Sequence, residues 1–251
     1  MELMKLVPRL AGREDAVVLT FEGGRVVERT HAALFDDVTR AAAKLAGWGV
    51  GPGTRVGIRA GNSYAWLVHD LALIELRAVS VAFTDDFSGD EPETLGARYR
   101  LSLLLLGHGR KSDLPWVASL DGDDDGVRCV DRGPAEPDPD FDRPFLVFSS
   151  GSSGGLKGMV QNRRGIEINV DAFAGRIAVG KGDRWLLFLP ISNFQQRMAY
   201  YLVLWRGLDL IIADPVRLFP ALQTLKPTIF IAPPTFYEGI ETRFHNLPLW
   251  K

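Results

Sequence analysis

Hydrophobic and polar positions alternate along this chain in the manner of strands that alternate with helices. Two strand-prone runs, Val17–Phe21 and Arg25–Arg29, flank a turn that contains two glycines, so they predict a β-hairpin. From Thr30, a residue type that caps helices, apolar residues recur at helical spacing and predict a helix over 30–48. The chain therefore begins with a hairpin followed by an amphipathic helix.

The alternation then continues to the end of the sequence. It predicts strands over 55–59, 79–83, 101–106, 144–148, 184–189, 208–213 and 228–232, and helices over 63–77, 91–99, 166–177, 193–205, 216–225 and from 234 onward. Strands that alternate with helices pair in parallel, because the helix carries the chain back to the same edge of the sheet. The predicted fold class is α/β, with parallel β-sheets flanked by helices. We expect the 251 residues to form an incomplete version of this fold.

An acidic segment over 121–142, rich in Asp and Pro and without apolar periodicity, interrupts this pattern. Such a composition is typical of a solvated surface loop. We therefore predict two α/β subdomains, one over 1–143 that includes this loop and one over 144–251 that begins with the next buried strand.

The acidic segment also matches the start of a calcium-binding EF-hand loop, through Asp121, Asp123, Asp125 and Gly126. An EF-hand closes its calcium cage with a bidentate Glu at the twelfth position, where this sequence has Arg132. A cation at that position disfavours a calcium site.

Composition narrows the classes of function. The formal net charge of -2 provides no basic field for nucleic acid or an anionic membrane. A single cysteine excludes an internal disulfide and a Cys-rich metal site, and the four His are too scattered for paired ligand spacing. No uncharged apolar run reaches the ~18 residues of a membrane span. We expect a cytoplasmic protein with no transmembrane segment.

The chemistry is concentrated in a Gly/Ser segment that follows the buried run Phe145–Phe148. Over residues 149–158 four glycines and four serines surround Lys157. Glycines let successive amides turn toward one centre, hydroxyls add donors, and lysine adds positive charge, so the segment suits a polyphosphate. The residues expected to bind it are Ser149, Ser150, Gly151, Ser152, Ser153, Gly154 and Lys157.

Three interpretations other than a polyphosphate site are possible for this segment. A flexible linker does not usually follow a buried strand directly. A Walker loop would need Gly at 156 and Ser or Thr at 158, where the sequence has Leu156 and Gly158. A serine hydrolase remains an alternative, because residues 151–155 satisfy G-x-S-x-G around Ser153, and Asp214 and His245 follow in the order of that fold. That motif, however, requires a helix directly after the nucleophile.

The run from Phe148 to Gly158 resembles the phosphate-binding signature of the adenylate-forming, or AMP-binding, superfamily. That signature reads aromatic, Thr/Ser, Ser, Gly, Ser/Thr, Thr, Gly, any residue, Pro, Lys, Gly. This chain departs from it at Ser153, which keeps the hydroxyl of Thr, and at Leu156, which replaces the rigid Pro.

Further segments resemble the same family in the same order. These are the helix over 30–48 with residues 49–57, the turn Gly61-Asn62-Ser63, residues 187–197, and residues 225–240. The segment over 187–197 is similar to the form L-P-L-A-H-x-x-E-R of long-chain acyl-CoA synthetases, with Asn193 at the position of the usual His. The resemblance therefore covers nearly the whole chain.

The resemblance implies an ATP-dependent reaction in which a carboxylic acid becomes an acyl-adenylate and is then transferred to a thiol, with CoA as the acceptor. It implies Mg²⁺, with Ser153 among its ligands, and an apolar or fatty acid held near Asn193, Phe194 and Arg197. The later family motifs and the C-terminal domain have no counterpart here. The isolated chain is therefore expected to be inactive and to need the missing C-terminal half in cis or in trans. The alternative is a non-catalytic half-domain that binds a nucleotide or a partner.

Overall fold

The computed structural model describes residues 1–87, 91–107, 109–110, 112–122, 124, 126–132, 138, 140–150 and 156–245. Its strands are β1 Val17–Glu22, β2 Arg25–Thr30, β3 Arg55–Arg59, β4 Val79–Phe83, β5 Leu103–Leu106, β6 Val117–Ser119, β7 Phe145–Ser150, β8 Leu156–Gln161, β9 Arg184–Leu187, β10 Asp209–Ile212 and β11 Ile229–Phe230. Its α-helices are α1 His31–Gly47, α2 Tyr64–Glu75, α3 Pro92–Tyr99, α4 Arg163–Arg176, α5 Phe194–Arg206, α6 Leu218–Leu225 and α7 Pro234–His245. Three short 3-10 helices, η1 Leu3–Lys5, η2 Pro8–Leu10 and η3 Pro215–Arg217, complete the described elements.

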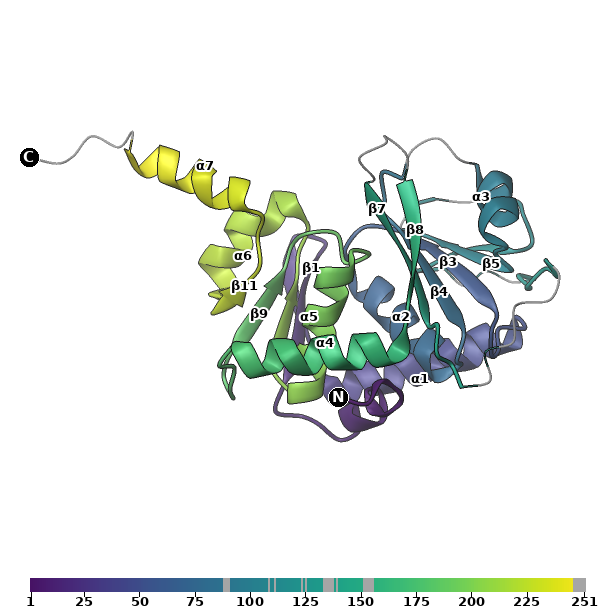
Figure 1. The fold of residues 1–251 in the computed structure, drawn as a ribbon, viewed down its shortest axis with the longest axis horizontal. Helices are drawn as coiled ribbons and strands as arrows, with labels where there is room; N and C mark the ends of the chain where they lie inside the picture. Colours follow the sequence, from purple (N-terminus) through teal and green to yellow (C-terminus); the bar gives the residue numbers. More distant parts are fainter. Residues whose placement is uncertain are drawn as a thin grey trace, which may run out of the picture.

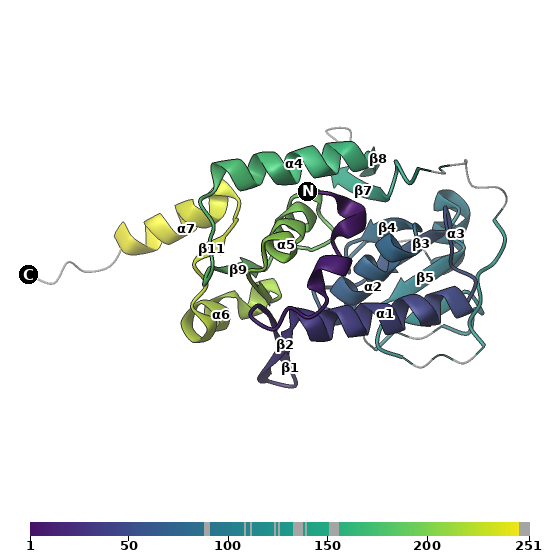
Figure 2. The same cartoon turned by 90° about the horizontal axis from the view of Figure 1, so that it is seen from below.

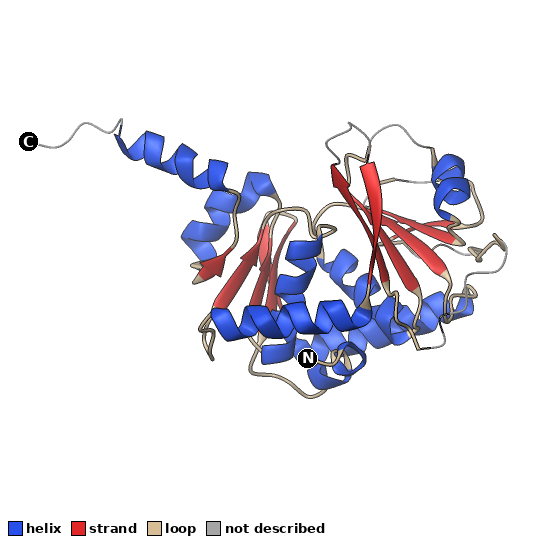
Figure 3. Cartoon of the chain, viewed as in Figure 1, coloured by secondary structure: helices blue, strands red, loops and turns tan. Residues whose placement is uncertain are grey.

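The strands form two sheets with helices between and around them (Figures 1 and 3). One sheet has the order β11-β9-β10-β1-β2 and the other the order β6-β5-β3-β4-β7-β8. Every pairing is parallel except β1 with β2 and β7 with β8. The predicted α/β class with largely parallel sheets is thus confirmed. The division of the chain at residue 143 stays a prediction, and each sheet takes strands from both sides of that position.

Local sequence signals explain where the early helices begin. The side chain of Thr30 accepts a hydrogen bond from the amide of Ala33 at 3.1 Å, and that of Ser63 accepts one from Trp66 at 3.1 Å. Each bond satisfies an amide that the first helical turn would leave unpaired. Asn162 caps α4 in the same way, so this helix begins at Arg163, three residues before the predicted start.

Strand β8 is the main element that the hydrophobic pattern missed. Its residues, Leu156–Gln161, mix polar and apolar types with glycine, so no strand period stands out. The strand forms because β7 offers a complete antiparallel ladder along its free edge. Pairing with the preceding strand thus replaces part of the loop predicted for this segment.

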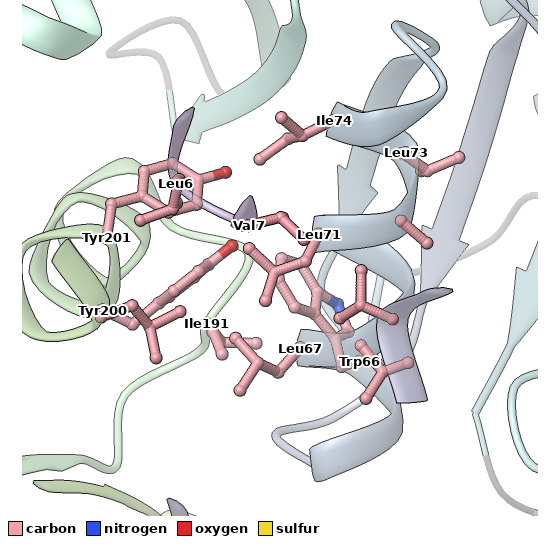
Figure 4. Close-up of a cluster of buried hydrophobic side chains, with 14 of the residues drawn as sticks. Leu6, Val7, Trp66, Leu67, Leu71, Leu73, Ile74, Ile191, Tyr200 and Tyr201 are labelled. Atoms are coloured by element: carbon pink, nitrogen blue, oxygen red, sulfur yellow. The ribbon is translucent and has the colours of Figure 1, made fainter. Parts of the chain in front are cut away.

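The main core lies between the two sheets. In Figure 2, α2 and α5 lie between α4 on one side and α1 on the other. Helix α2 is buried on nearly all sides, which explains its weak amphipathic pattern. Figure 4 shows Leu67 and Leu71 of α2 in one apolar cluster with Tyr200 of α5, Ile191 of the loop before α5 and Leu6 of the N-terminal segment. This layer of helices sets the position of one sheet relative to the other.

Candidate functional site

The predicted phosphate loop lies at the end of the β7–β8 hairpin. Phe148 pairs with Gly158, and Ser149 pairs with Lys157, so both ends of the Gly/Ser segment are neighbours across the ladder. Residues 151–155, including the expected ligands Gly151, Ser152, Ser153 and Gly154, lie outside the described residues, as do the side chains of Ser149, Ser150 and Lys157. Strand β7 runs parallel to β4, and the loop follows its carboxyl end (Figure 1). Parallel α/β sheets bind their ligands at that edge.

An aromatic cluster supports the base of this hairpin. The ring of Phe148 stacks on Phe83 with centroids 5.0 Å apart, and it contacts Phe87 at 5.3 Å and Tyr99 at 5.0 Å. Phe83 belongs to β4, and Tyr99 ends α3. The last apolar residue before the phosphate loop is therefore fixed to two further elements.

The local structure after the loop disfavours the serine hydrolase alternative. A nucleophile elbow needs a helix directly after the reactive serine. Here residues 156–161 form strand β8, and the next helix begins only at Arg163. Ser153 and the side chain of His245 lie outside the described residues. The strand β8 after the segment also differs from a Walker loop, which opens a helix.

The first turn of α5 carries two of the residues expected to contact the acid. Asn193 is exposed and occupies the N-cap position, but its side chain makes no capping hydrogen bond. Asn193 thus begins the helix without a side-chain cap. Phe194 is half-buried beside it. Both residues follow β9 in the sequence, and the carboxyl ends of β9 and β7 point to the same side of the molecule (Figure 1).

Asn62 connects the two sheets at this edge. Its Nδ2 donates to the carbonyl of Leu189 at 2.9 Å and to that of Ala213 at 2.8 Å, and its Oδ1 accepts from the amide of Ile191 at 2.8 Å. Asn62 follows β3 of one sheet, whereas its partners follow β9 and β10 of the other. The motif Gly61-Asn62-Ser63 indicated a turn at this position but predicted no role for the side chain of Asn62. The structure shows that this amide positions the loop that leads to Asn193.

Arg197, the third residue expected to contact the acid, is completely buried. Its Nη2 donates to Asp70 of α2 and, at 2.7 Å, to Ser80 of β4. The other oxygen of Asp70 accepts from Tyr200 and, at 2.8 Å, from Tyr201. A carboxylate inside the apolar run of α2 was the signal that could have revealed this cluster, because buried charges require partners.

A cavity of about 550 Å³ opens between the β1–β2 turn, the start of α2 and η3. Its described lining includes Asn62, Arg29 and Arg217 but none of the residues expected to bind phosphate or acid. Arg29 forms an ion pair with Glu22 at 2.8 Å, and Arg217 lies 3.6 Å from Asp214. Both guanidinium groups of the lining thus have carboxylate partners.

The part of the chain that the structure describes holds no cluster of three or more His, Cys, Asp or Glu side chains arranged for a metal ion. Asp123 and Asp125 of the EF-hand-like segment lie outside the described residues. Among the described helices, none is long and apolar enough to cross a bilayer.

The architecture is that of adenylate-forming enzyme N-terminal domains. The N-terminal domain of FACL13 from Mycobacterium tuberculosis superimposes with a TM-score of 0.76 at 20% identity, over 98% of this chain and 67% of that one. An o-succinylbenzoate CoA synthetase from Bacillus subtilis, solved in complex with ATP and magnesium, superimposes with a TM-score of 0.75 at 17% identity, over 94% of this chain and 65% of that one.

Sequence comparison leads to the family itself. The family model described as AMP-binding enzyme matches residues 8–249, so the chain belongs to the AMP-binding enzyme family. It is 26% identical to the long-chain-fatty-acid–CoA ligase FadD15 of Mycobacterium bovis, over 84% of this chain and 40% of the ligase. It is 24% identical to tyrocidine synthase 3 of Brevibacillus parabrevis, over 84% of this chain and 3% of the synthase. The chain thus spans less than half the length of these curated relatives.

Proposed function

We propose that this chain forms the phosphate-binding part of an acyl-adenylate-forming ligase. The observation that carries the proposal is the β7–β8 hairpin, which brings Ser149 and Lys157 to neighbouring positions at the carboxyl end of a parallel strand. In this proposal the seven residues that hold the β- and γ-phosphates are Ser149, Ser150, Gly151, Ser152, Ser153, Gly154 and Lys157. Ser153 contributes a hydroxyl ligand to Mg²⁺.

The chemistry is acid activation. A carboxylate oxygen attacks the α-phosphorus of ATP, the bond to the bridging oxygen of pyrophosphate breaks, and acyl-adenylate and pyrophosphate form. A thiol, for which we propose CoA, then attacks the acyl carbon and releases AMP. Negative charge grows on the departing pyrophosphate, so fixed amide and hydroxyl donors and the Lys157 ammonium stabilise the transition state. Mg²⁺, when bound, adds further compensation of this charge.

The acid is proposed to bind at the first turn of α5. Exposed Asn193 offers a neutral amide to the carboxylate, and half-buried Phe194 offers an apolar surface. The similarity of residues 187–197 to the long-chain synthetase form favours a fatty or otherwise apolar acid. Met198, Tyr201 and Leu202 follow Phe194 on α5 and are buried in the core, so they serve packing in this chain. Arg197 is buried as well and would act on the acid only through its neighbours.

The experiment is a titration of the purified chain with MgATP by calorimetry. The wild type is expected to bind, and Lys157→Ala is expected to bind about ten to one hundred times more weakly, because a hydrogen bond to a charged group contributes about 1.5–3 kcal/mol. The matched control is Lys181→Ala, since Lys181 is exposed and pairs with Asp15 at 3.2 Å, on another part of the surface.

A folded wild type without affinity for MgATP, or equal affinity in both lysine variants, would contradict the phosphate site. ATP–pyrophosphate exchange by the isolated chain is expected to be absent, because half of a site positions its reactants poorly. Robust exchange would show instead that 251 residues suffice.

A further inference from the structure

A cluster of buried polar residues joins α5 to the sheet that contains β4, β7 and β8, close to the proposed site. The cluster consists of Asp70, Ser80, Arg197, Tyr200 and Tyr201, and all five residues are buried. Asp70 and Arg197 have no exposed side-chain surface. Three elements contribute, namely α2, β4 and α5. The cluster is therefore the polar connection between the helix layer and the sheet that contains the phosphate hairpin.

The charges within the cluster are matched. Burial is the largest single effect on Arg197 and lowers its pKa, but Asp70, Tyr201 and Tyr200 together outweigh burial, so the pKa is raised. Burial raises the pKa of Tyr200 and of Tyr201, so both phenols stay protonated and can donate to the carboxylate. Asp70 accepts from four donor groups, as Ser80 also reaches it at 3.1 Å. The cluster is neutral and has one defined arrangement of donors and acceptors.

Arg197 also contacts the strand that leads into the phosphate loop. Its guanidinium carbon lies 4.1 Å from the ring centroid of Phe145, the first residue of β7, and 5.2 Å from that of Trp66. Phe145 stacks on Tyr201 as well, with centroids 5.8 Å apart. The start of β7 is thus in contact with α5 on the face that carries the cluster.

Ser80 fixes the same strand from the other side. Its amide donates to the carbonyl of Pro144 at 2.9 Å, and its Cα is paired with that of Phe145 in the β4–β7 ladder. Only two residues of β7 pair with β4, Phe145 and Leu146. Because this ladder is short, the contacts of Phe145 with Ser80 and Arg197 add to those of Phe148 in attaching the hairpin.

Stability alone gives no reason for a buried ion pair at this place. Apolar residues of similar volume in place of a buried ion pair are often neutral or stabilising, because the charges lose their hydration. What the ion pair provides is direction, since Nη2 of Arg197 donates to both Asp70 and Ser80 within the plane of a rigid guanidinium. Apolar packing has no comparable directionality.

We propose that Arg197 is a positioning residue, which with Asp70 fixes the first turn of α5 relative to the hairpin that holds the phosphate loop. Arg197 lies one helical turn after Asn193, and its guanidinium contacts the first residue of β7. The inference rests on the proposed function, in which Asn193 contacts the acid and the hairpin holds the phosphates. Acid activation requires the carboxylate and the α-phosphorus in one fixed geometry.

The test compares Arg197→Met with the double variant Arg197→Met/Asp70→Asn. The single variant leaves a buried carboxylate without its cation, so we expect a large loss of stability in urea unfolding. The double variant removes both charges and keeps hydrogen-bond partners for the tyrosines, so we expect it to recover at least half of that loss. Arg184→Met is the control, because it removes an ion pair of 3.3 Å with Asp209 far from the hairpin.

Two readouts separate positioning from simple structural support. In the double variant, amide hydrogen exchange is expected to be at least tenfold faster in β7, β8 and the first turn of α5, and unchanged in β1 and β10. Its dissociation constant for MgATP is expected to be at least tenfold higher than that of the wild type. The control is expected to change neither the local exchange nor the affinity.

Two results would overturn the positioning role. One is amide hydrogen exchange at the wild-type rate across the hairpin of the stabilised double variant. The other is a uniform increase of the exchange rate over all strands. If the double variant does not fold, the same two readouts are measured on Arg197→Lys, which keeps the charge and loses the planar guanidinium. Wild-type behaviour of Arg197→Lys in both readouts would then refute the inference. If the wild type binds no MgATP, the proposed function fails, and the exchange data still decide whether Arg197 positions the hairpin.

Discussion

The side-chain oxygen of Asn62 accepts a 2.8 Å hydrogen bond from the amide of Ile191, 129 residues further along the chain. The same side chain donates to the carbonyls of Leu189 and Ala213. The side-chain amide of Asn62 supplies two donors for the carbonyls and one acceptor for the backbone amide, and thus joins the carboxyl edges of both sheets. The loop that it holds is the one that ends at Asn193.

Asn62→Ala is expected to lower the free energy of unfolding by about 2–3 kcal/mol, because three partly buried backbone groups lose their partner. Asn62→Asp keeps the acceptor for Ile191 and loses both donors, so a similar loss is expected. The control is Asn169→Ala on α4, whose only described bond is an exposed one to the carbonyl of Gly165 at 2.7 Å. Urea unfolding measures all three, and equal stability of the Asn62 and Asn169 alanine variants would contradict this role.

His31, the first residue of α1, makes stability depend on pH. Burial, with a smaller contribution from Arg13, lowers the pKa of His31 to about 4 in the folded chain. In the unfolded chain its pKa is about 6.5, so the unfolded state binds the extra proton between these values. We expect about 3 kcal/mol of stability to be lost as the pH falls from about 7 to about 4.

His31→Leu removes this proton uptake. The variant is expected to lose less stability between neutral and acidic pH than the wild type, even if its stability at pH 7.5 differs. The dependence that remains includes His69, whose pKa burial also lowers. Urea unfolding at several pH values checks the slope, and an unchanged slope in His31→Leu would assign the effect to other groups.

The three polar residues before α1, α2 and α5 are expected to differ in their contribution to stability. Thr30→Ala and Ser63→Ala each remove a capping bond of 3.1 Å and are expected to cost about 1 kcal/mol. Asn193→Ala removes no capping bond and is expected to change stability by less than about 0.5 kcal/mol. Thermal unfolding of the three variants tests this order. A cost for Asn193→Ala equal to the other two would show that its side chain does cap α5.

Substitution by alanine is expected to change stability in opposite directions at two glycines, one at the end of a helix and one inside a helix. Gly207 ends α5 with φ +70°, and an added Cβ would lie 2.6 Å from Nη1 of Arg13, so Gly207→Ala is destabilising. The strain of the left-handed conformation alone costs about 1–2 kcal/mol. Gly165 lies inside α4 with nothing within 4 Å of the added Cβ, so Gly165→Ala is stabilising, by about 0.5–1 kcal/mol. A change of the same sign in both variants, measured by urea unfolding, would contradict this argument.

The sequence by itself determined most of the local structure. Strands over 55–59 and 79–83 have the predicted bounds, and the predicted helix over 30–48 corresponds to α1, with Thr30 as its cap. These elements depend on residues close in sequence, on apolar periodicity and on capping side chains, all of which are visible in the chain. The membership in the AMP-binding family was predicted from ordered motifs for the same reason and is confirmed.

Only the tertiary structure decided which distant groups meet. Asn62 bonds loops of the other sheet, and Arg197 was expected at the acid but is buried against Asp70, 127 residues away. No local pattern encodes these pairs, because a polar side chain has the same neighbours in sequence whether it meets solvent or a buried partner. Desolvation in the folded core makes the pairing obligatory, since a charge that leaves water must find its complement there.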